Sequence, residues 1–459
     1  MLQIRTRHAA SDVRAVPRRG RTRRDRRDWC ARAAGALSAL ALILASTGCD
    51  SLLDVDPSPD TVPEEELRRP TALQSRMIGA EANFFLAYDM AIVFGGLYTD
   101  ELADPNNAID ERRVTEDNGL IGATDEAPEG IDGLWTPMQR AAFTSNQMQD
   151  DILAGSFGDL IPEPEGSPEL ARMSLFAGYT KLVLGELFCS TAFNGVGPEH
   201  SSEETHGLAV EELTSAIDAI DEAAANQEDL DVLYAALVAR ARAHLHRGET
   251  EQALQDAMRV PADWEYIADV YSNNSQLEEN DIWNMLTDSK RFTVAETFRD
   301  LTVDDTGESD PRVDVFQDPD APFSIDGQTP QFQSRKYTVS TAPIRLASGD
   351  EARYIIAEIA ATTNGAAGLE TAVDIINAVR ARHGIATAWA PSGPTQDMVL
   401  RELLDERGRT LFLEGQRMAD LRRYLERYAI DAFPESPDPD LAGTCMPLPL
   451  AERDNNPEI

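Results

Sequence analysis

The feature that most constrains the fold is a pair of helical segments whose facing positions carry small side chains. Apolar spacing predicts helices over residues 233–245 and 250–258, with a tight turn at residues 247–249 and a stop at Pro261. The small residues are Ala241, Ala243, Gly248 and Ala253. Because small side chains let two antiparallel helices approach closely, the pattern predicts a helical hairpin and a mainly α-helical protein.

The spacing of these small residues resembles a tetratricopeptide repeat, a helix pair with a period of about 34 residues. Arg240 and His244 stand where that repeat prefers Leu and Tyr, so this is a degenerate copy. A comparable hairpin is predicted over residues 351–382, and its Ala372 lies 119 residues beyond Ala253, which is not a multiple of the period. We therefore expect separated helix pairs and not one uninterrupted array.

Three regions of different character follow the amino terminus. Helical spacing dominates residues 70–261, whereas residues 262–345 lack strong periodicity and are expected to form loops with a few short strands. An irregular stretch of this length inside a folded protein is usually a functional surface, so we expect it to contact a ligand or a partner. Residues 346–459 return to helical spacing, with one long helix expected over 397–428 and an extended, Pro-rich tail from Phe433.

The amino terminus has the pattern of an export signal. The first 49 residues hold 11 Arg against three Asp, and the apolar run at residues 33–45 is too short to span a membrane. The small residues before Cys49 resemble a bacterial lipobox, although Ser46 stands where that pattern prefers Leu. We expect residues 1–48 to be a lipoprotein signal peptide, Cys49 to carry lipid and residues 49–69 to form a lipid-anchored tether. The alternative is an ordinary signal peptide with an incidental Cys.

The charge of the chain excludes one class of partner. The sequence holds 41 Lys and Arg against 80 Asp and Glu, a formal net charge of -39. Without its first 49 residues the chain would hold 30 basic and 77 acidic side chains. Such a field repels phosphate groups, so nucleic acid is excluded as a partner. The hydrophobic fraction of 42% nevertheless indicates a folded protein and not a disordered one.

Known metal and cofactor motifs are missing from the sequence, so we expect no cofactor and no metal. His244 and His246 face different sides of their helix and cannot share an ion, and zinc-type Cys pairs are absent. Residues 54–60 alternate in the manner of a calcium loop but lack its Gly, which favours a hydrated tether. Cys189 and Cys445 would remain after export, and whether they pair is left open by the sequence.

Patterns that could suggest catalysis have structural explanations. Glu414 and Arg417 stand three residues apart and are expected to pair along the long carboxyl-terminal helix, and Asp420 is placed for further salt bridges near its end. No nucleophile motif is present. With so many acidic residues, close carboxylate pairs are unavoidable and say nothing about glycosidase chemistry.

Candidate ligand contacts are aromatic and amide side chains in or near the irregular region. A sugar site needs exposed aromatic faces with hydrogen-bonding groups beside them. Trp264 and Tyr271 open the irregular region next to Asn273. Trp389 lies in a loop flanked by Pro and Gly. These four residues are our candidates, and the alternative is that their side chains pack in the core.

The carboxyl-terminal sequence resembles the SusD/RagB family of nutrient-binding outer-membrane lipoproteins. Residues 402–423 contain ELLDER followed by LFLEGQRMADLRR, which is similar to a characteristic helix of that family. Residues 343–382, the Asp-Pro-Arg at 310–312 and the ending at 446–457 resemble further markers in the same order. Ala419 replaces the usual aromatic residue before the Asp, which indicates a divergent branch.

This resemblance implies a SusD-like fold, mainly α, with tetratricopeptide-like helix pairs and a loop-rich region with few short strands. It implies a lipid-anchored protein of the outer membrane, facing the cell exterior, that captures an oligosaccharide or a peptide. A SusC-like TonB-dependent outer-membrane transporter would receive the nutrient. The binder itself would perform no covalent chemistry, so we expect no enzyme. Two alternatives stay open: an envelope tetratricopeptide-type scaffold without a nutrient ligand, and an envelope hydrolase.

The lipid anchor can be tested at one residue. Replacing Cys49→Ala should abolish acylation and release the protein from membranes, because several acyl chains on one Cys supply the anchoring free energy. Incorporation of labelled palmitate and membrane fractionation measure the two effects. Labelling that persists in the variant would contradict the prediction.

Overall fold

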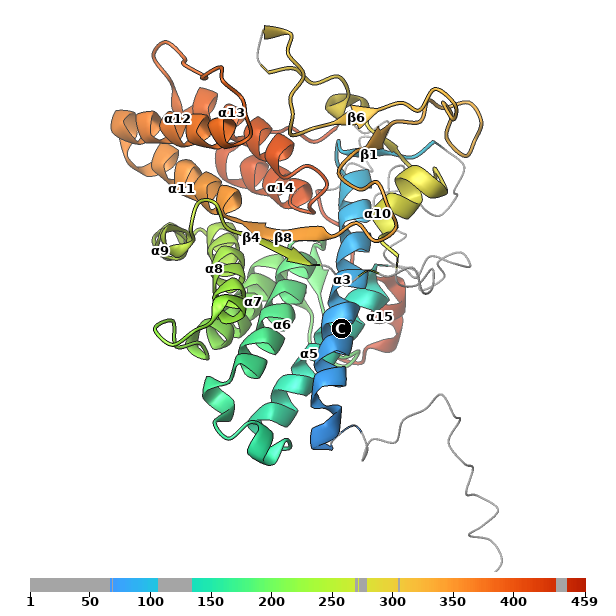
Figure 1. The fold of residues 1–459 in the computed structure, drawn as a ribbon, viewed down its shortest axis with the longest axis vertical. Coiled ribbons are helices and arrows are strands. Elements are labelled where there is room, and N and C mark those ends of the chain that lie inside the picture. Colours follow the sequence, from blue (N-terminus) through green and yellow to red (C-terminus); the bar gives the residue numbers. More distant parts are fainter. Residues whose placement is uncertain are drawn as a thin grey trace, which may run out of the picture. The chain divides into compact units, whose positions relative to one another are not determined.

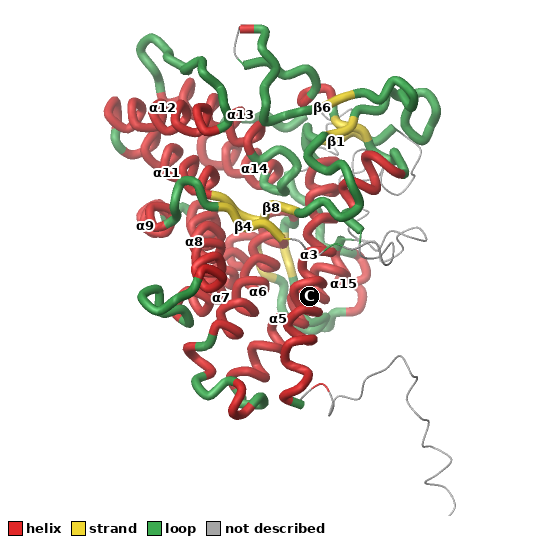
Figure 2. The backbone as a smooth tube through the Cα atoms, viewed as in Figure 1, coloured by secondary structure: helices red, strands yellow, loops and turns green. Residues whose placement is uncertain are grey.

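The structure, a computed structural model, describes residues 67, 69–105, 134–268, 271, 279–303, 306–434 and 444–459. Helices dominate this part of the chain, and short strands lie between them (Figures 1 and 2). The α-helices are α3 (Leu73–Leu97), α5 (Trp135–Leu153), α6 (Pro168–Leu187), α7 (Ser202–Asp218), α8 (Gln227–Arg247), α9 (Thr250–Arg259), α10 (Asp281–Trp283), α11 (Gly349–Thr363), α12 (Gly365–Arg382), α13 (Gln396–Thr410), α14 (Arg417–Tyr428) and α15 (Leu450–Asn455). The strands are β1 (Leu102–Ala103), β2 (Ser190–Thr191), β3 (His200–Ser201), β4 (Glu265–Ala268), β5 (Thr293–Val294), β6 (Val315–Phe316), β7 (Gln333–Ser334) and β8 (Ile344–Ser348). The predicted mainly helical fold with few short strands is confirmed.

Strands β4 and β8 form the longest ladder in the described residues. Glu265 pairs with Ser348 and Ala268 with Ile344, antiparallel, with a register shift midway along β4. The other ladders, β1–β5, β2–β3 and β6–β7, are antiparallel pairs of two residues each. Helices α8 and α11 both contact β8, so this ladder joins the helices that precede it to those that follow it (Figure 1).

Helix α3 is buried on nearly all of its sides. The stretch Pro70–Leu97 is long and apolar enough to cross a membrane, but 67% of its most apolar window is buried inside the structure. Phe84, Phe85 and Tyr88 are at most 1% exposed. The Phe84 ring packs against the rings of Phe85, Tyr88 and Phe176, the last of which belongs to α6. A helix that is apolar all round is the centre of a core. In this structure α3 has that role.

The predicted hairpin of small residues is formed by α8 and α9. Gly248 ends α8 with φ +77°, a left-handed conformation that glycine adopts without strain. Ala241, Ala243 and Ala253 are fully buried, as the close approach of the two helices requires. Helices α11 and α12 form the second predicted pair, which turns at Gly365 with φ +57°.

The single helix predicted over residues 397–428 is wrong, because the chain breaks between α13 and α14. Leu413 and Gly415 have positive φ values of 54° and 87°. Distant side chains hold this turn: the Glu101 carboxyl accepts the Leu413 N–H at 2.8 Å, and the Tyr337 hydroxyl donates to the Leu413 carbonyl oxygen at 2.9 Å. The apolar spacing of the sequence carries no information about such distant partners, so the prediction based on it extended the helix through the turn.

The predicted pairing of Glu414 with Arg417 is also wrong, because the two residues belong to the turn and to the next helix. The Glu414 carboxylate accepts hydrogen bonds from Lys336 and, at 2.9 Å, from Arg345 Nε. Arg417 makes a bidentate pair with Asp100, with both N–O distances at 2.8 Å. These contacts join the carboxyl-terminal helices to β8 and to the end of α3.

The carboxyl terminus is fixed to the body by a disulfide and a short helix. Cys189 and Cys445 form a disulfide with a Cα–Cα distance of 5.1 Å, which answers the question that the sequence left open. Next to it, the backbone N–H of Met446 donates to Leu187 and its carbonyl oxygen accepts from Cys189. The prediction of an extended tail from Phe433 is wrong for residues 450–455, which form α15. Residues 435–443 lie outside the described part of the chain. Pro449, with a fixed φ, immediately precedes α15.

A network of buried ion pairs crosses the middle of the protein. Arg242 of α8 contacts Glu186 of α6 at 2.8 Å and Glu351 of α11 at 3.2 Å. Arg423 of α14 pairs with Glu358 of α11 and with Asp420 of its own helix. Asp420 also pairs with Arg407 of α13. We name this set the buried ion network. Its members, each at most 2% exposed, are Glu186, Arg242, Glu351, Glu358, Arg407, Asp420 and Arg423.

The buried Glu101 predicts a pH dependence of stability. Burial raises the pKa of Glu101 from 4.5 to about 8. Because the folded pKa lies above the unfolded one, the stabilisation is complete below about pH 4.5 and is lost as the pH rises through about 8. Between about pH 6 and about pH 9, the titration of Glu101 should lower the free energy of unfolding by roughly 2–3 kcal/mol. The variant Glu101→Gln should not show this decrease, and urea unfolding at both pH values measures it.

An exposed glutamate nearby supplies the control. Glu296 follows Ala295, whose N–H donates to the Glu101 carbonyl oxygen at 2.9 Å, but the Glu296 side chain is exposed. Glu296→Gln should therefore keep the wild-type pH dependence. Equal alkaline losses in the wild type and in Glu101→Gln would show that the Glu101 carboxyl does not titrate in this range.

Candidate functional site

Two hollows flank strand β4. The first, which we name the β4 hollow, has a volume of about 660 Å³ and lies between β4 and the helices α3, α6 and α8. This volume falls within the range of small-ligand sites in proteins. The hollow is lined by Ile78, Glu81, Ala82, Arg172, Glu228, Asp231, Val232, Glu265, Tyr266, Ile267 and Ala268.

The polar groups of the β4 hollow are held by one another before any ligand binds. Arg172 donates to Glu81 at 2.5 Å and to Glu228 at 2.9 Å, so a single guanidinium fixes carboxylates from α3 and α8. Burial raises the pKa of Glu81, and the charge of Arg172 opposes that shift. The indole Nε1 of Trp264 donates to Asp231 at 2.8 Å. The polar side of the β4 hollow therefore presents carboxylate acceptors and the Arg172 guanidinium donor in fixed positions.

Apolar and aromatic surface completes the β4 hollow. Tyr266 is half-buried, while Ile78 and Ile267 are 55% and 49% exposed. These exposed aliphatic side chains stand beside the fixed polar groups of the hollow. An aromatic face with neighbouring hydrogen-bonding groups can bind a sugar ring or a peptide side chain.

The second hollow, which we name the β8 hollow, has a volume of about 410 Å³. Its charged groups are balanced by local partners: Arg345 contacts Glu265 and Glu414, both at 2.7 Å. Arg335 lies over the Phe316 ring at 4.0 Å. The lining residues are Glu265, Ile267, Pro311, Arg312, Asp314, Ser334, Arg335, Lys336, Pro343, Arg345, His383 and Thr410. Because β4 contributes to both hollows, a ligand in either one would touch this strand.

Trp264 and Tyr271, two of the predicted ligand contacts, lie in the core. Trp264 is 8% exposed and packs edge-on against Tyr234 with ring centroids 5.6 Å apart. Its indole supports Asp231 from behind and does not itself line the β4 hollow. Tyr271 is 6% exposed, and its hydroxyl donates to the Phe85 carbonyl oxygen at 3.2 Å.

Trp389 is half-buried against the helices α12 and α13 and lines neither hollow. Two hydrogen bonds with the Asn377 side chain, at 2.7 and 2.9 Å, fix its backbone. Asn273 lies outside the described residues, as does the predicted lipidation site Cys49. Ligand contact by the four predicted residues therefore stays a prediction.

The predicted residues Trp264 and Tyr271 lie close to β4 in the sequence, but most of the residues that line the β4 hollow were not predicted. Tyr266 stands two residues after Trp264 and belongs to the same aromatic group, so the signal lay in the sequence. Arg172 and Asp231 come from helices far away in the chain and carry no motif. Only the packing of α6 and α8 against β4 brings them together.

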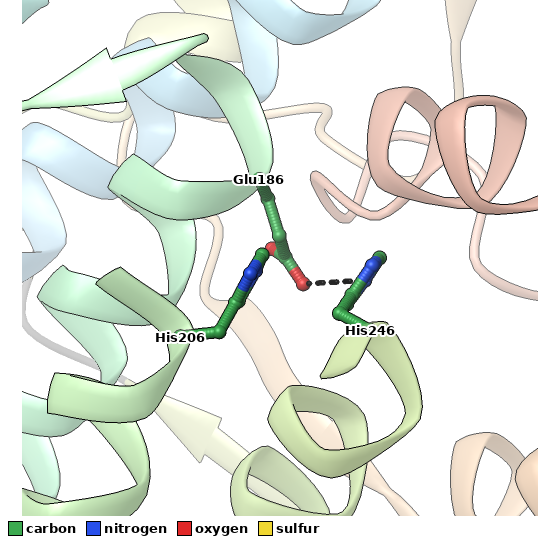
Figure 3. Close-up of side chains that lie close together, drawn as sticks. All are labelled: Glu186, His206 and His246. Carbon is green, nitrogen blue, oxygen red and sulfur yellow. Dashed lines mark ion pairs between the residues drawn. The ribbon is translucent and has the colours of Figure 1, made fainter. Parts of the chain in front are cut away.

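One group of metal-capable side chains occurs among the described residues: Glu186, His206 and His246, whose ligand atoms all lie within 4.8 Å of one another. They come from α6, α7 and α8 (Figure 3). The imidazole rings are stacked, with centroids 4.8 Å apart and planes at 7°. Burial lowers the pKa of His206 and of His246 well below the ordinary value, so both rings are neutral. Sequence spacing could not reveal this group, because its members lie on three helices.

The carboxyl-terminal sequence and the fold are both similar to those of known proteins. Residues 324–458 match the sequence pattern of the SusD family. A SusD superfamily protein from Bacteroides vulgatus is 15% identical with a TM-score of 0.61, covering 85% of this chain and 97% of that one. Surface glycan-binding protein A from Bacteroides uniformis is 15% identical with a TM-score of 0.59, covering 85% and 98%. A SusD-like carbohydrate-binding protein from Bacteroides vulgatus is 16% identical with a TM-score of 0.56, covering 77% and 83%. No curated protein matches the chain.

The fold is therefore that of the SusD superfamily: paired helices with a loop-rich region inserted between them. The matched residues 324–458 include the segment 402–423, which carried the resemblance in the sequence. The sequence match to the SusD family covers residues 324–458, and the likeness over the rest of the chain is one of fold.

Proposed function

We propose that the protein is a surface lipoprotein that captures an oligosaccharide, or alternatively a peptide, for import across the outer membrane. It would be anchored through Cys49 and would deliver its ligand to a SusC-like TonB-dependent transporter. Two solved proteins of the same fold are described as binding carbohydrate or surface glycan, which supports a sugar as the ligand. The protein would bind without a covalent step.

The single observation that carries the ligand site is the β4 hollow. Its carboxylates are held by Arg172 and Trp264, so binding a polyol there would require little ordering of side chains. Sugar hydroxyls both donate and accept hydrogen bonds, which suits a rim of carboxylates with a guanidinium. Tyr266 provides an aromatic surface for the apolar face of a sugar ring.

The helix pairs do not favour the scaffold alternative. A scaffold of tetratricopeptide repeats would stack its pairs into a continuous array with an open groove. Here the pair α8–α9 and the pair α11–α12 are separated in the sequence by the loop-rich residues that form β4 to β8, although α9 and α11 pack against each other. The inserted strand β4 lines the two hollows, which an uninterrupted array of helix pairs would lack.

Ligand binding can be tested on a glycan and peptide array with the full-length protein purified in detergent. We expect binding to at least one oligosaccharide class. Tyr266→Ala should weaken this binding by about 5-fold or more, because an aromatic contact contributes roughly 1 kcal/mol beyond its buried area. Calorimetric titration of the wild type and the variant with the best array ligand measures the ratio.

Phe316→Ala is the matched control for the array ligand. Phe316 is a half-buried aromatic residue on β6, stacked under Arg335 and outside the β4 hollow. Its replacement should leave the affinity unchanged. Loss of binding in Phe316→Ala with normal binding in Tyr266→Ala would move the site away from the β4 hollow, and no binding to any glycan or peptide would favour the scaffold.

Delivery to a transporter predicts a stable complex in the membrane. Purification from native envelopes in mild detergent should recover a large β-barrel protein together with this chain. Native mass spectrometry of the purified material measures the complex and its stoichiometry. A reproducible monomer without such a partner would contradict the capture function.

A further inference from the structure

The buried ion network holds more carboxylates than guanidinium groups. Among the described residues it contains four carboxylates and three guanidinium groups. Arg242 alone serves both Glu186 and Glu351. The Glu186 carboxylate is therefore held by Arg242 on one side, while its Oε1 also faces His246.

Arg422, a further cation near Glu186, has different partners. Arg422 donates to the carbonyl oxygens of Gly185 and Glu186 at 3.3 and 3.0 Å, at the carboxyl end of α6. It also lies 3.8 Å from the Glu426 carboxylate. Arg422 thus caps a helix end, where unpaired carbonyl groups attract positive charge.

One ring nitrogen of His206 has no hydrogen-bond partner among the described residues. His206 is 3% exposed, and its Nε2 has no hydrogen-bond partner among the described residues. Gly185 makes room for this ring, since a Cβ there would lie 3.2 Å from Nε2. An unpartnered buried nitrogen is destabilising unless a ligand satisfies it.

The spacing of the three side chains suits one metal ion. His246 Nε2 lies 3.4 Å from Glu186 Oε1, close to the separation of about 3.3 Å between two ligand atoms on a tetrahedral zinc ion. The third ligand atom, from His206, is within 4.8 Å of the others. Because a nitrogen lone pair lies in the plane of its ring, one of the two stacked rings has to turn before both can bind the same ion. Arg242 contacts the Glu186 carboxylate at 2.8 Å and would orient it from outside.

We propose that Glu186, His206 and His246 bind one divalent transition metal ion, with Zn²⁺ as the best fit. Two neutral imidazoles and one carboxylate form a common three-residue zinc set that leaves a fourth position open. All three residues line a hollow of about 350 Å³ from which water can supply the fourth ligand. The ion would join the ends of α6 and α8 to α7, beside the disulfide. This inference is independent of the nutrient ligand.

Zinc binding can be measured on the full-length protein in detergent after removal of metals with a chelator. Titration with Zn²⁺ in competition with a chromophoric chelator should show one ion per chain. His206→Gln and His246→Gln should each weaken binding by about 100-fold, because each removes one of three ligands. Ca²⁺ should not compete, since it prefers oxygen ligands.

His383→Gln is the matched control. His383 also contacts a carboxylate, with Nε2 lying 2.8 Å from Asp350, but it stands outside the cluster. Its replacement should leave zinc affinity unchanged. Zinc uptake that is equal in the wild type, His206→Gln and His246→Gln would assign the ion to surface carboxylates and overturn the proposal, as would the absence of stoichiometric uptake by the wild type.

A second measurement on the wild type alone covers the case in which a variant does not fold. An ion that binds only the folded state raises its stability, so saturating Zn²⁺ should raise the Tm. Co²⁺ in the same site should give the visible absorption of a four-coordinate ion, and Zn²⁺ should displace it. An unchanged Tm together with an octahedral Co²⁺ spectrum would contradict the site.

Discussion

The buried ion network is the interaction on which the rest of the structure depends. Charges from five helices meet in it, and a missing partner would leave a charge uncompensated in the interior. Although burial opposes it, the charges of Arg407 and Arg423 lower the pKa of Asp420, so this carboxylate stays ionised. The network therefore selects one mutual register of α6, α8, α11, α13 and α14, where apolar packing alone would tolerate several.

This fixed arrangement determines where a ligand surface can form. The turn between α13 and α14 is held by Glu101 and Tyr337, and Glu414 in that turn contacts Arg345 of β8. β8 carries β4, and β4 lines both hollows. The hollows thus have walls from helices and from a strand whose position is set by buried charge, which gives a rigid surface to a region that is otherwise irregular.

The SusD fold describes the framework of this protein, and the residues of the candidate site come from its own structure. Solved proteins of the same fold share only about one residue in seven with this chain. At that distance the helical framework persists, while lining residues such as Arg172 and Tyr266 have to be taken from this structure alone. The cluster of Glu186, His206 and His246 is a further feature of this chain's own geometry, placed at the framework and away from the β4 hollow.

The sequence by itself determined the mainly helical class, the α8–α9 hairpin and the likeness of residues 324–458 to the SusD family. These depend on local periodicity, on small contact residues and on a continuous motif over residues 402–423. Only the tertiary structure decided the break at Leu413, the Cys189–Cys445 disulfide and the lining of the hollows. Each of these depends on groups that are distant in the chain and meet only when the helices pack. The tertiary structure also placed Trp264 and Tyr271 in the core. The sequence could not do so, because an aromatic side chain in an irregular segment gives no local signal of whether its face meets solvent or other apolar groups.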